Sequence, residues 1–186
     1  MYDITEKDTV LGIAELSFDL SVFDIFGVLG AGGTLVLPDP QKGPDAFHWG
    51  SLLKDYGVTL WNTVPAQAEM LDAFAAKTEQ YGSVRLVLLS GDRINPGLPG
   101  RLRNIMPHAK IISLGGATEG GIWSIYHEIS QAEETPSVLY GRALPGQWVG
   151  VLDEKWNICP DYAAGQIAIG GGSLAEGYLG DKELTG

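Results

Sequence analysis

The sequence is short of basic residues. Twelve Lys and Arg residues stand against 23 Asp and Glu residues, which gives a formal net charge of -11. Because nucleic acids and anionic membranes are held by clustered Lys and Arg, this balance argues against either partner. A small anionic ligand such as a nucleotide is still compatible with the charge, since backbone amides and a metal ion can bind phosphate.

Cysteine and histidine are also scarce. The single thiol, Cys159, cannot form a disulfide within the chain, which fits a reducing compartment. We expect Cys159 to be a small buried residue rather than a catalytic nucleophile. The three histidines, His48, His108 and His127, have no ligand spacing to one another or to the cysteine, so they give little support to a zinc site. No apolar run reaches membrane-spanning length, and the first residues show no basic segment followed by an apolar run, so we expect a cytoplasmic protein.

Short apolar runs alternate with amphipathic segments over residues 1–136. We expect an α/β core here, with a mostly parallel β-sheet covered by helices. Residues 137–186 change to short alternating strands and turns, which predicts a small appended β subregion. Expected strands lie at 10–16, 34–38, 58–64, 84–92, 109–116, 148–153 and 165–171, and expected helices at 18–29, 45–55, 65–75 and 95–107.

Ligands of parallel sheets bind beyond the carboxyl ends of the strands. The segments that follow the expected strands, 18–23, 62–65, 90–92 and 114–123, should therefore converge on one cleft. Thr118 and Glu119 offer hard oxygen ligands of the kind that Mg²⁺ prefers, or alternatively a helix cap and a favourable first-turn carboxylate. Asp19 fits either a helix N-cap or an anion that pairs with a ligand ammonium, whereas Asp24 is expected to face elsewhere.

Six segments carry a specific family resemblance. They read LSFDLSVFDIFGVLGAGGTLVL, LWNTVPAQAEML, VRLVLLSGD, ISLGGATEGGIWSI, YGRALPGQWVGVLD and GQIAIGGGSLAEGYLGD. In this order they resemble the core motifs of nonribosomal peptide synthetase adenylation domains, whose wider relatives are acyl-CoA ligases and luciferases. The resemblance implies that residues 1–186 are a partial adenylation domain, the central part of its large N-terminal subdomain, without the phosphate loop or the C-terminal subdomain.

The resemblance also implies an activity and its partners. Such domains use Mg²⁺ and ATP to convert an amino acid into an aminoacyl adenylate, which passes to the phosphopantetheine thiol of a peptidyl carrier domain. A condensation or cyclisation domain is the further partner expected in the parent protein. Carried over by motif position, Glu119 would hold Mg²⁺ and Thr118 would contact phosphate, while the adenine face would be lined by Gly91, Asp92, Gly115 and Gly116. Where the family has an aromatic residue and Gly-Pro before Thr-Glu, this chain has Gly115, Gly116 and Ala117, which removes a stacking surface for adenine.

The same motifs imply an amino-acid pocket. Asp19 falls where the family keeps an aspartate for the substrate ammonium, and the remaining lining positions are Leu20, Phe23, Asn62, Leu88, Ser90, Leu114, Ile122 and Trp123. Six apolar and two small polar side chains suit a modest, soft side chain and reject a charged one. The pattern resembles the cysteine-activating members of siderophore and thiazole assembly lines, so we expect L-cysteine, with valine or serine as competing substrates.

Two other readings stay open. The chain could be a non-catalytic nucleotide-binding or scaffold fragment of the same fold, or a relative of the acyl-CoA ligases. We expect little or no catalysis from the isolated chain, because the separate parts of one catalytic site act as a unit.

Overall fold

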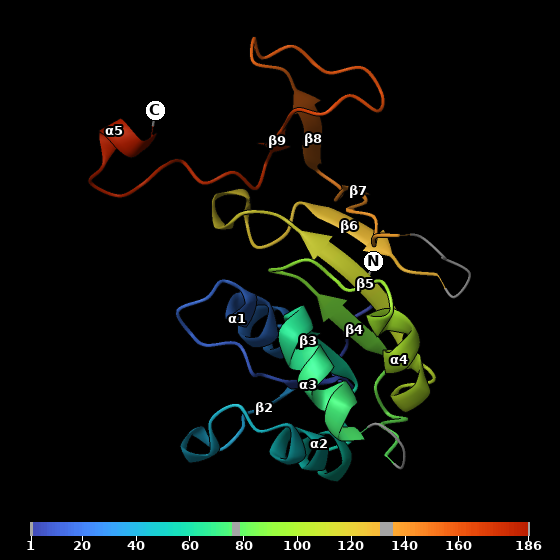
Figure 1. Ribbon diagram of the computed structural model, residues 1–186. Helices are drawn as coiled ribbons and strands as arrows, with labels where there is room; N and C mark the ends of the chain where they lie inside the picture. The colour runs from blue at the N-terminus through green and yellow to red at the C-terminus, as the bar shows by residue number, and fades with distance from the viewer. Residues whose placement is uncertain (1, 76–78, 131–135, 186) are drawn as a thin grey trace. The chain divides into compact units, whose positions relative to one another are not determined.

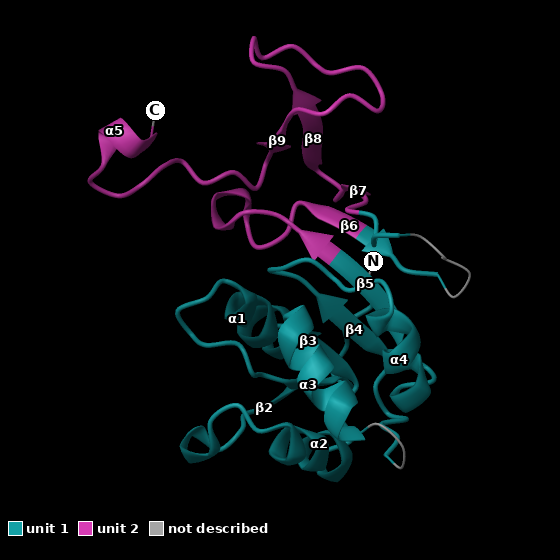
Figure 2. Cartoon of the chain, viewed as in Figure 1, with its two compact units in different colours: residues 1–113, 127–139 teal, residues 114–126, 140–186 magenta. Residues whose placement is uncertain are grey.

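The computed structural model describes residues 2–75, 79–130 and 136–185 and divides the chain into two compact units (Figure 2). Unit 1 comprises Met1–Ser113 and His127–Leu139, and unit 2 comprises Leu114–Tyr126 and Tyr140–Gly186. Unit 2 thus takes the loop after residue 113 as well as most of the β-rich segment expected from residue 137.

Unit 1 is built on a parallel sheet, as its alternating sequence pattern predicts (Figure 1). The spatial order of its first five strands is β2-β1-β3-β4-β5, and each bonded pair described is parallel. The strands are shorter than expected but lie within or beside the expected ranges. Their bounds are β1 Thr9–Leu11, β2 Thr34–Val36, β3 Leu60–Thr63, β4 Leu86–Leu89 and β5 Lys110–Gly115. All residues of β3 and β4 are buried, which is why these runs lack polar alternation.

Three helices cover one face of this sheet. They are α2 (Ala46–Asp55), α3 (Pro65–Ala75) and α4 (Leu98–Ile105), close to the expected ranges. The carboxylate of Asp45 caps α2 by accepting a hydrogen bond from the Phe47 amide at 2.9 Å. The main hydrophobic core lies between these helices and the strands, and its members include Trp49, Leu53, Leu71, Leu102, Trp61, Val87, Leu89 and Ile111.

The segment expected as one amphipathic helix over 18–29 is a turn of α-helix, α1 (Leu20–Val22), that runs into a π-helix, η1 (Phe23–Val28). The spacing of the apolar residues in this segment predicts a stripe that packs on the core, and this prediction is wrong; the stripe consists of Phe18, Val22, Ile25, Phe26 and Leu29. Phe18 and Phe26 are 60% and 72% exposed, whereas Asp24 is buried. The buried residues of this segment are Ser21, Asp24 and Val28, and the Asp24 carboxyl accepts a hydrogen bond from the Asn62 amide of β3.

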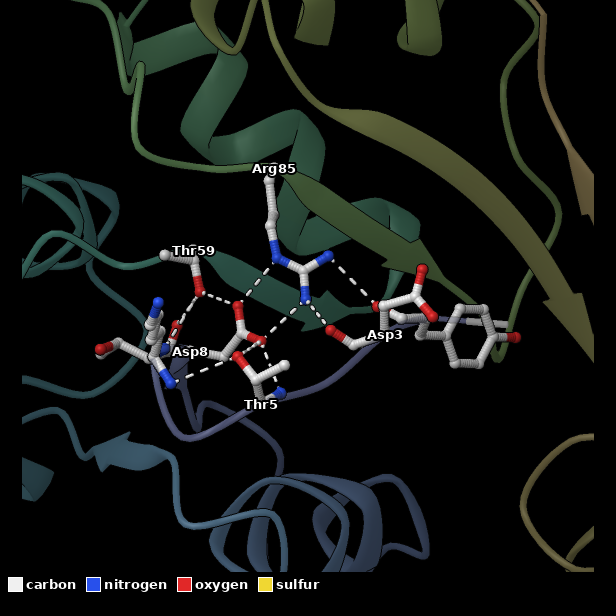
Figure 3. Close-up of polar contacts among 8 residues, drawn as sticks. Asp3, Thr5, Asp8, Thr59 and Arg85 are labelled. Atoms are coloured by element: carbon white, nitrogen blue, oxygen red, sulfur yellow. Dashed lines mark hydrogen bonds and ion pairs between the residues drawn. The ribbon is translucent and has the colours of Figure 1, made fainter.

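A polar cluster ties together the amino ends of three neighbouring strands (Figure 3). Asp8 precedes β1, Thr59 precedes β3 and Arg85 precedes β4. Arg85 donates from Nε to Asp8 Oδ1 and from Nη2 to Asp8 Oδ2, both at 2.8 Å, while Thr59 Oγ1 donates to Oδ1 at 2.7 Å. The Thr5 amide adds a bond of 2.9 Å to Oδ2. This cluster lies at the strand ends opposite to those where the sequence predicts the ligand site.

Unit 2 contains two antiparallel pairings, in line with the predicted β subregion. Within it, Ile125 and Tyr126 of β6 (Ile125–Glu128) pair with Ala143 and Arg142 of β7 (Arg142–Ala143). A hairpin joins β8 (Gln147–Leu152) to β9 (Gln166–Gly171) through six residue pairs. A 3-10 turn, η3 (Thr118–Gly120), follows β5, and a short helix, α5 (Lys182–Thr185), comes last. Among the described residues, no helix is long and apolar enough to cross a membrane.

Candidate functional site

Unit 1 brings three of the predicted pocket residues onto one face of its sheet. Asn62 of β3 lies directly beside Leu88 of β4, and Ser90 follows two residues later, where the pleat returns its side chain to the same face. All three are buried. Trp61, Val87 and Leu89 belong to the helix-covered core, so the predicted pocket residues occupy the opposite face.

The predicted residues on α1 and η1 lie over this second face or beside it. Asp19 is half-buried and its side chain makes no capping hydrogen bond to α1, so the structure gives no support to the N-cap alternative. Leu20 lines a pocket of about 220 Å³ together with Phe18, Thr63 and other side chains of unit 1. Phe23 is half-buried and packs edge-on against the Tyr2 ring, with ring centroids 6.4 Å apart.

Asp24 is one functional candidate that sequence reasoning missed. It was expected to face elsewhere, yet it is only 2% exposed and its Oδ1 accepts a hydrogen bond of 3.0 Å from Asn62 Nδ2. Burial raises the Asp24 pKa to about 7, and the bond from Asn62 lowers it only in part. An acidic residue inside the otherwise apolar run VFDIF was the signal in the sequence.

The nucleotide candidates of unit 1 follow β4 directly. Gly91 and Asp92 are exposed. Gly91 has φ +85°, a left-handed conformation that favours glycine, and a Cβ there would lie 3.3 Å from Val64 Cγ1. The Asp92 carboxylate accepts a hydrogen bond from the Arg93 amide at 2.6 Å. The turn therefore exposes backbone and a carboxylate at the carboxyl end of the strand, as predicted.

Thr118 and Glu119 lie together in unit 2, on the turn η3 after β5. Both are exposed and line a pocket of about 290 Å³. The N-cap position of η3 belongs to Ala117 and no side chain caps the turn, so the capping alternative for Thr118 has no support. The remaining lining residues are Ala175, Glu176, Gly177, Tyr178 and Thr185, all from the segment after β9.

The Tyr178 hydroxyl donates a hydrogen bond to Glu119 Oε1. This bond is the main reason why the Glu119 pKa lies below its usual value, and it raises the pKa of Tyr178. The Ala175 amide also donates to the Glu119 carbonyl at 2.7 Å, so the later segment is bound to η3 by backbone as well as by side chain. Sequence reasoning missed Tyr178, because no local pattern links positions 59 apart.

This pocket fits the ligand needs of Mg²⁺ in part. Among the described residues, no group of three or more His, Cys, Asp or Glu side chains could hold a metal ion. Mg²⁺ is commonly bound by one or two carboxylates together with phosphate oxygens, and Glu119 and Glu176 supply such carboxylates in one pocket. The donor set therefore suits a magnesium–nucleotide complex rather than a free ion.

Other parts of unit 2 lie close to Gly115 and Gly116. A Cβ on Gly115 would fall 2.3 Å from the Tyr140 ring, and one on Gly116 would fall 2.9 Å from the Ser124 amide nitrogen. Gly115 is buried and Gly116 is exposed. A side chain is therefore excluded at Gly116, where the Cβ would meet backbone, whereas at Gly115 it would require the half-exposed Tyr140 ring to move. The predicted place of both glycines on the adenine face stays a prediction.

The last three predicted pocket residues also belong to unit 2. Leu114 and Trp123 are buried, and Ile122 is half-buried. Ile122 has φ +53°, which is rare for a β-branched residue and stores backbone strain. Gln147 Nε2 donates to the Trp123 carbonyl at 2.8 Å, which anchors this loop to β8.

Replacing Tyr178 with Phe is expected to raise the Glu119 pKa toward that of an ordinary glutamate, because the lost hydroxyl is the main group that stabilises the ionised form. Carbon-13 NMR titration of the Glu119 carboxyl measures the change. Tyr162→Phe is the control, since Tyr162 is fully exposed. An unchanged Glu119 pKa in Tyr178→Phe would contradict the hydrogen bond.

Comparison with known proteins assigns residues 1–179 to the family model "AMP-binding enzyme". The chain is 49% identical over 187 residues to pyochelin synthetase PchF of Pseudomonas aeruginosa, a match that covers 99% of this chain and 10% of PchF. It superposes on the AMPPNP-bound nonribosomal peptide synthetase FmoA3 with a TM-score of 0.94 at 35% identity, covering 98% of this chain and 20% of FmoA3. PA1221, a nonribosomal peptide synthetase protein containing adenylation and PCP domains, gives a TM-score of 0.88 at 26% identity, over 99% of this chain and 37% of PA1221. The chain thus spans about a tenth of PchF and a fifth of FmoA3.

Proposed function

The chain belongs to the AMP-binding enzyme family, as part of a nonribosomal peptide synthetase adenylation domain, and we propose that it carries the amino-acid pocket and part of the nucleotide site of that domain. The observation that carries the proposal is the superposition of 98% of the chain on AMPPNP-bound FmoA3 with a TM-score of 0.94. The proposed reaction joins an amino acid to ATP, giving an aminoacyl adenylate and pyrophosphate.

The residues of this chain would act mainly by binding and orienting the reactants. Asp19 would pair with the substrate ammonium, which leaves the substrate carboxylate free to attack the α-phosphorus. The Thr118 hydroxyl would donate to a phosphate oxygen, while Gly91, Asp92, Gly115 and Gly116 would line the adenine side. Glu119, with Glu176 in the same pocket, would hold Mg²⁺. When bound, that ion offsets negative charge on the phosphates.

L-Cysteine is the proposed substrate. The pocket residues of unit 1 combine the apolar Leu20, Phe23 and Leu88 with the polar groups of Asn62 and Ser90, and they are wholly or partly buried. This composition excludes a charged side chain and accommodates a small soft one. Valine and serine are the competing substrates.

The acceptor of the activated amino acid is proposed to be a phosphopantetheine thiol on a peptidyl carrier domain. PA1221, which superposes on 99% of this chain, contains an adenylation and a PCP domain, and this supports a carrier partner. PchF is a pyochelin synthetase, which supports a place in siderophore assembly, where a condensation or cyclisation domain would use the product.

Amino-acid-dependent exchange of labelled pyrophosphate into ATP tests the proposal. The full-length protein that contains this chain is assayed with each of the twenty amino acids, and we expect cysteine to give the highest exchange. Exchange with valine or serine instead would keep the adenylation reaction and overturn the cysteine assignment. Exchange with no amino acid would favour the non-catalytic or acyl-CoA ligase reading.

A further inference from the structure

Six buried side-chain polar atoms of unit 1 have no hydrogen-bond partner among the described residues. Three of the six belong to the residues around the second face of the sheet, namely Asp24 Oδ2, Asn62 Oδ1 and Ser90 Oγ. Their residues are at most 3% exposed, so solvent does not satisfy these atoms either. An unsatisfied buried polar atom costs about 1–3 kcal/mol. Three such atoms around one face of a sheet indicate that a bound ligand supplies the missing hydrogen-bond partners.

The amide of Asn62 can adopt only one of its two orientations. Its Nδ2 donates to Asp24 Oδ1 at 3.0 Å and to the Leu20 carbonyl at 3.1 Å. A side-chain amide nitrogen carries two hydrogens, so both donors are used. Turning the amide over would set its oxygen against the carbonyl oxygen of Leu20 and the carboxyl of Asp24. Asn62 Oδ1 is therefore the group left for a ligand, and it can only accept.

Asp24 has no other described task. Among the described residues, its one hydrogen bond is that from Asn62, and no Lys, Arg or His pairs with it. Two strands contact η1, namely β1 (Thr9–Leu11) and β2 (Thr34–Val36), and neither carries a titratable side chain. The strand β3 carries none either. On the α1 segment, Asp19 is the one charged side chain. Burial raises the Asp24 pKa to about 7, which means that the ionised carboxyl is destabilised at this position. The hydrogen bond from Asn62 is the contact that gives the carboxyl a role here.

We propose that Asp24 is a positioning residue that sets substrate specificity: by holding the Asn62 amide, it leaves Asn62 Oδ1 and Ser90 Oγ to be satisfied by a hydrogen-bond donor on the substrate side chain. This inference rests on the proposed function and deepens it. A thiol or hydroxyl supplies such a donor, whereas a methyl group in its place leaves Asn62 Oδ1 unsatisfied. The site thereby discriminates cysteine from an amino acid of the same shape without a donor.

The test compares cysteine with 2-aminobutyrate, which has a methyl group in place of the thiol, in pyrophosphate exchange by the full-length protein. In Asp24→Leu we expect the ratio of the two kcat/KM values to fall about 5- to 10-fold, mainly through the KM for cysteine. Asp24→Asn keeps an acceptor for the Asn62 amide and should retain the wild-type ratio. Asp55→Leu, at an exposed helix end, is the matched control. If Asp24 had a purely structural role, its replacement would lower kcat/KM for both substrates equally and leave their ratio unchanged.

A double variant keeps the test decisive if Asp24→Leu does not fold. Replacing both partners with apolar residues removes the unpaired amide, so Asp24→Leu/Asn62→Leu should fold and discriminate no worse than Asn62→Leu alone. A further loss of discrimination in the double variant would overturn the inference, because Asp24 would then act independently of Asn62. If the wild type does not prefer cysteine to 2-aminobutyrate, the proposed substrate and this inference both fail. If it does prefer cysteine and folded Asp24→Leu keeps the ratio, the inference alone fails.

Discussion

Glu119→Gln is expected to lower amino-acid-dependent pyrophosphate exchange by the full-length protein about 100- to 1000-fold. Glutamine keeps the shape of the side chain but removes the charge that would hold Mg²⁺ against the phosphates, and loss of one such electrostatic contact commonly has an effect of this size. Glu119 is exposed in its pocket, so the substitution should leave the fold intact. Steady-state exchange over a range of Mg²⁺ concentrations measures both the loss and its dependence on the ion.

Two variants separate a metal-binding role from general damage to the pocket. Glu154→Gln removes an exposed carboxylate from the turn between β8 and β9 and should retain wild-type activity. Glu119→Asp keeps the charge and should recover part of the activity at raised Mg²⁺. Exchange by Glu119→Gln within a few-fold of the wild type would remove Glu119 from the site and leave the altered GGATE segment without a catalytic role.

The sheet of unit 1 could be predicted from the sequence because burial on both faces gives runs with no polar alternation. LVLL in β4 and the apolar part of KIISLG in β5 are such runs, and both strands lie inside the expected ranges. The orientation of the helix over 18–29 could not be predicted in the same way. Periodicity shows that Phe18 and Phe26 share one face, but it does not show which face packs on the sheet. The observed orientation depends on tertiary contacts such as the hydrogen bond from Asn62 to Asp24, which joins residues 38 positions apart.

The candidate site was predictable to the extent that it depends on strand ends. Asn62, Leu88 and Ser90 converge because β3 and β4 are neighbours in register, which follows from their order in a parallel sheet. Tyr178 and Tyr140 were missed, because they reach Glu119 and Gly115 from distant loops that carry no periodic pattern. Long-range contacts made by loops depend on tertiary packing, which cannot be predicted from local sequence patterns.

The second large effect is expected at the opposite ends of the strands, where Asp8 is only 3% exposed and bonded to Arg85, Thr59 and Thr5 (Figure 3). These bonds, with that from Arg85 the largest cause, lower the Asp8 pKa from 3.8 to about 2. A carboxylate whose pKa is lower in the folded than in the unfolded state stabilises the fold by about 1.4 kcal/mol per pH unit of difference, or about 2 kcal/mol here. Asp8→Ala removes these bonds, but water can solvate the Arg85 guanidinium, which is 39% exposed, so we expect the free energy of unfolding to fall by about 2–3 kcal/mol.

The pH dependence distinguishes this cluster from ordinary packing. The stabilisation is complete above the unfolded pKa of 3.8 and is lost as the pH falls from about 4 toward 2, where Asp8 becomes protonated in the folded state too. Asp8→Asn cannot ionise, so the difference in unfolding free energy between wild type and Asp8→Asn should shrink over this interval. Urea unfolding at pH 7, 4, 3 and 2 measures it, with Asp161→Asn as an exposed control. A difference that stays constant down to pH 2 would mean that the lost stability comes from packing at position 8, and that the bonds to Arg85 contribute no net free energy to the fold.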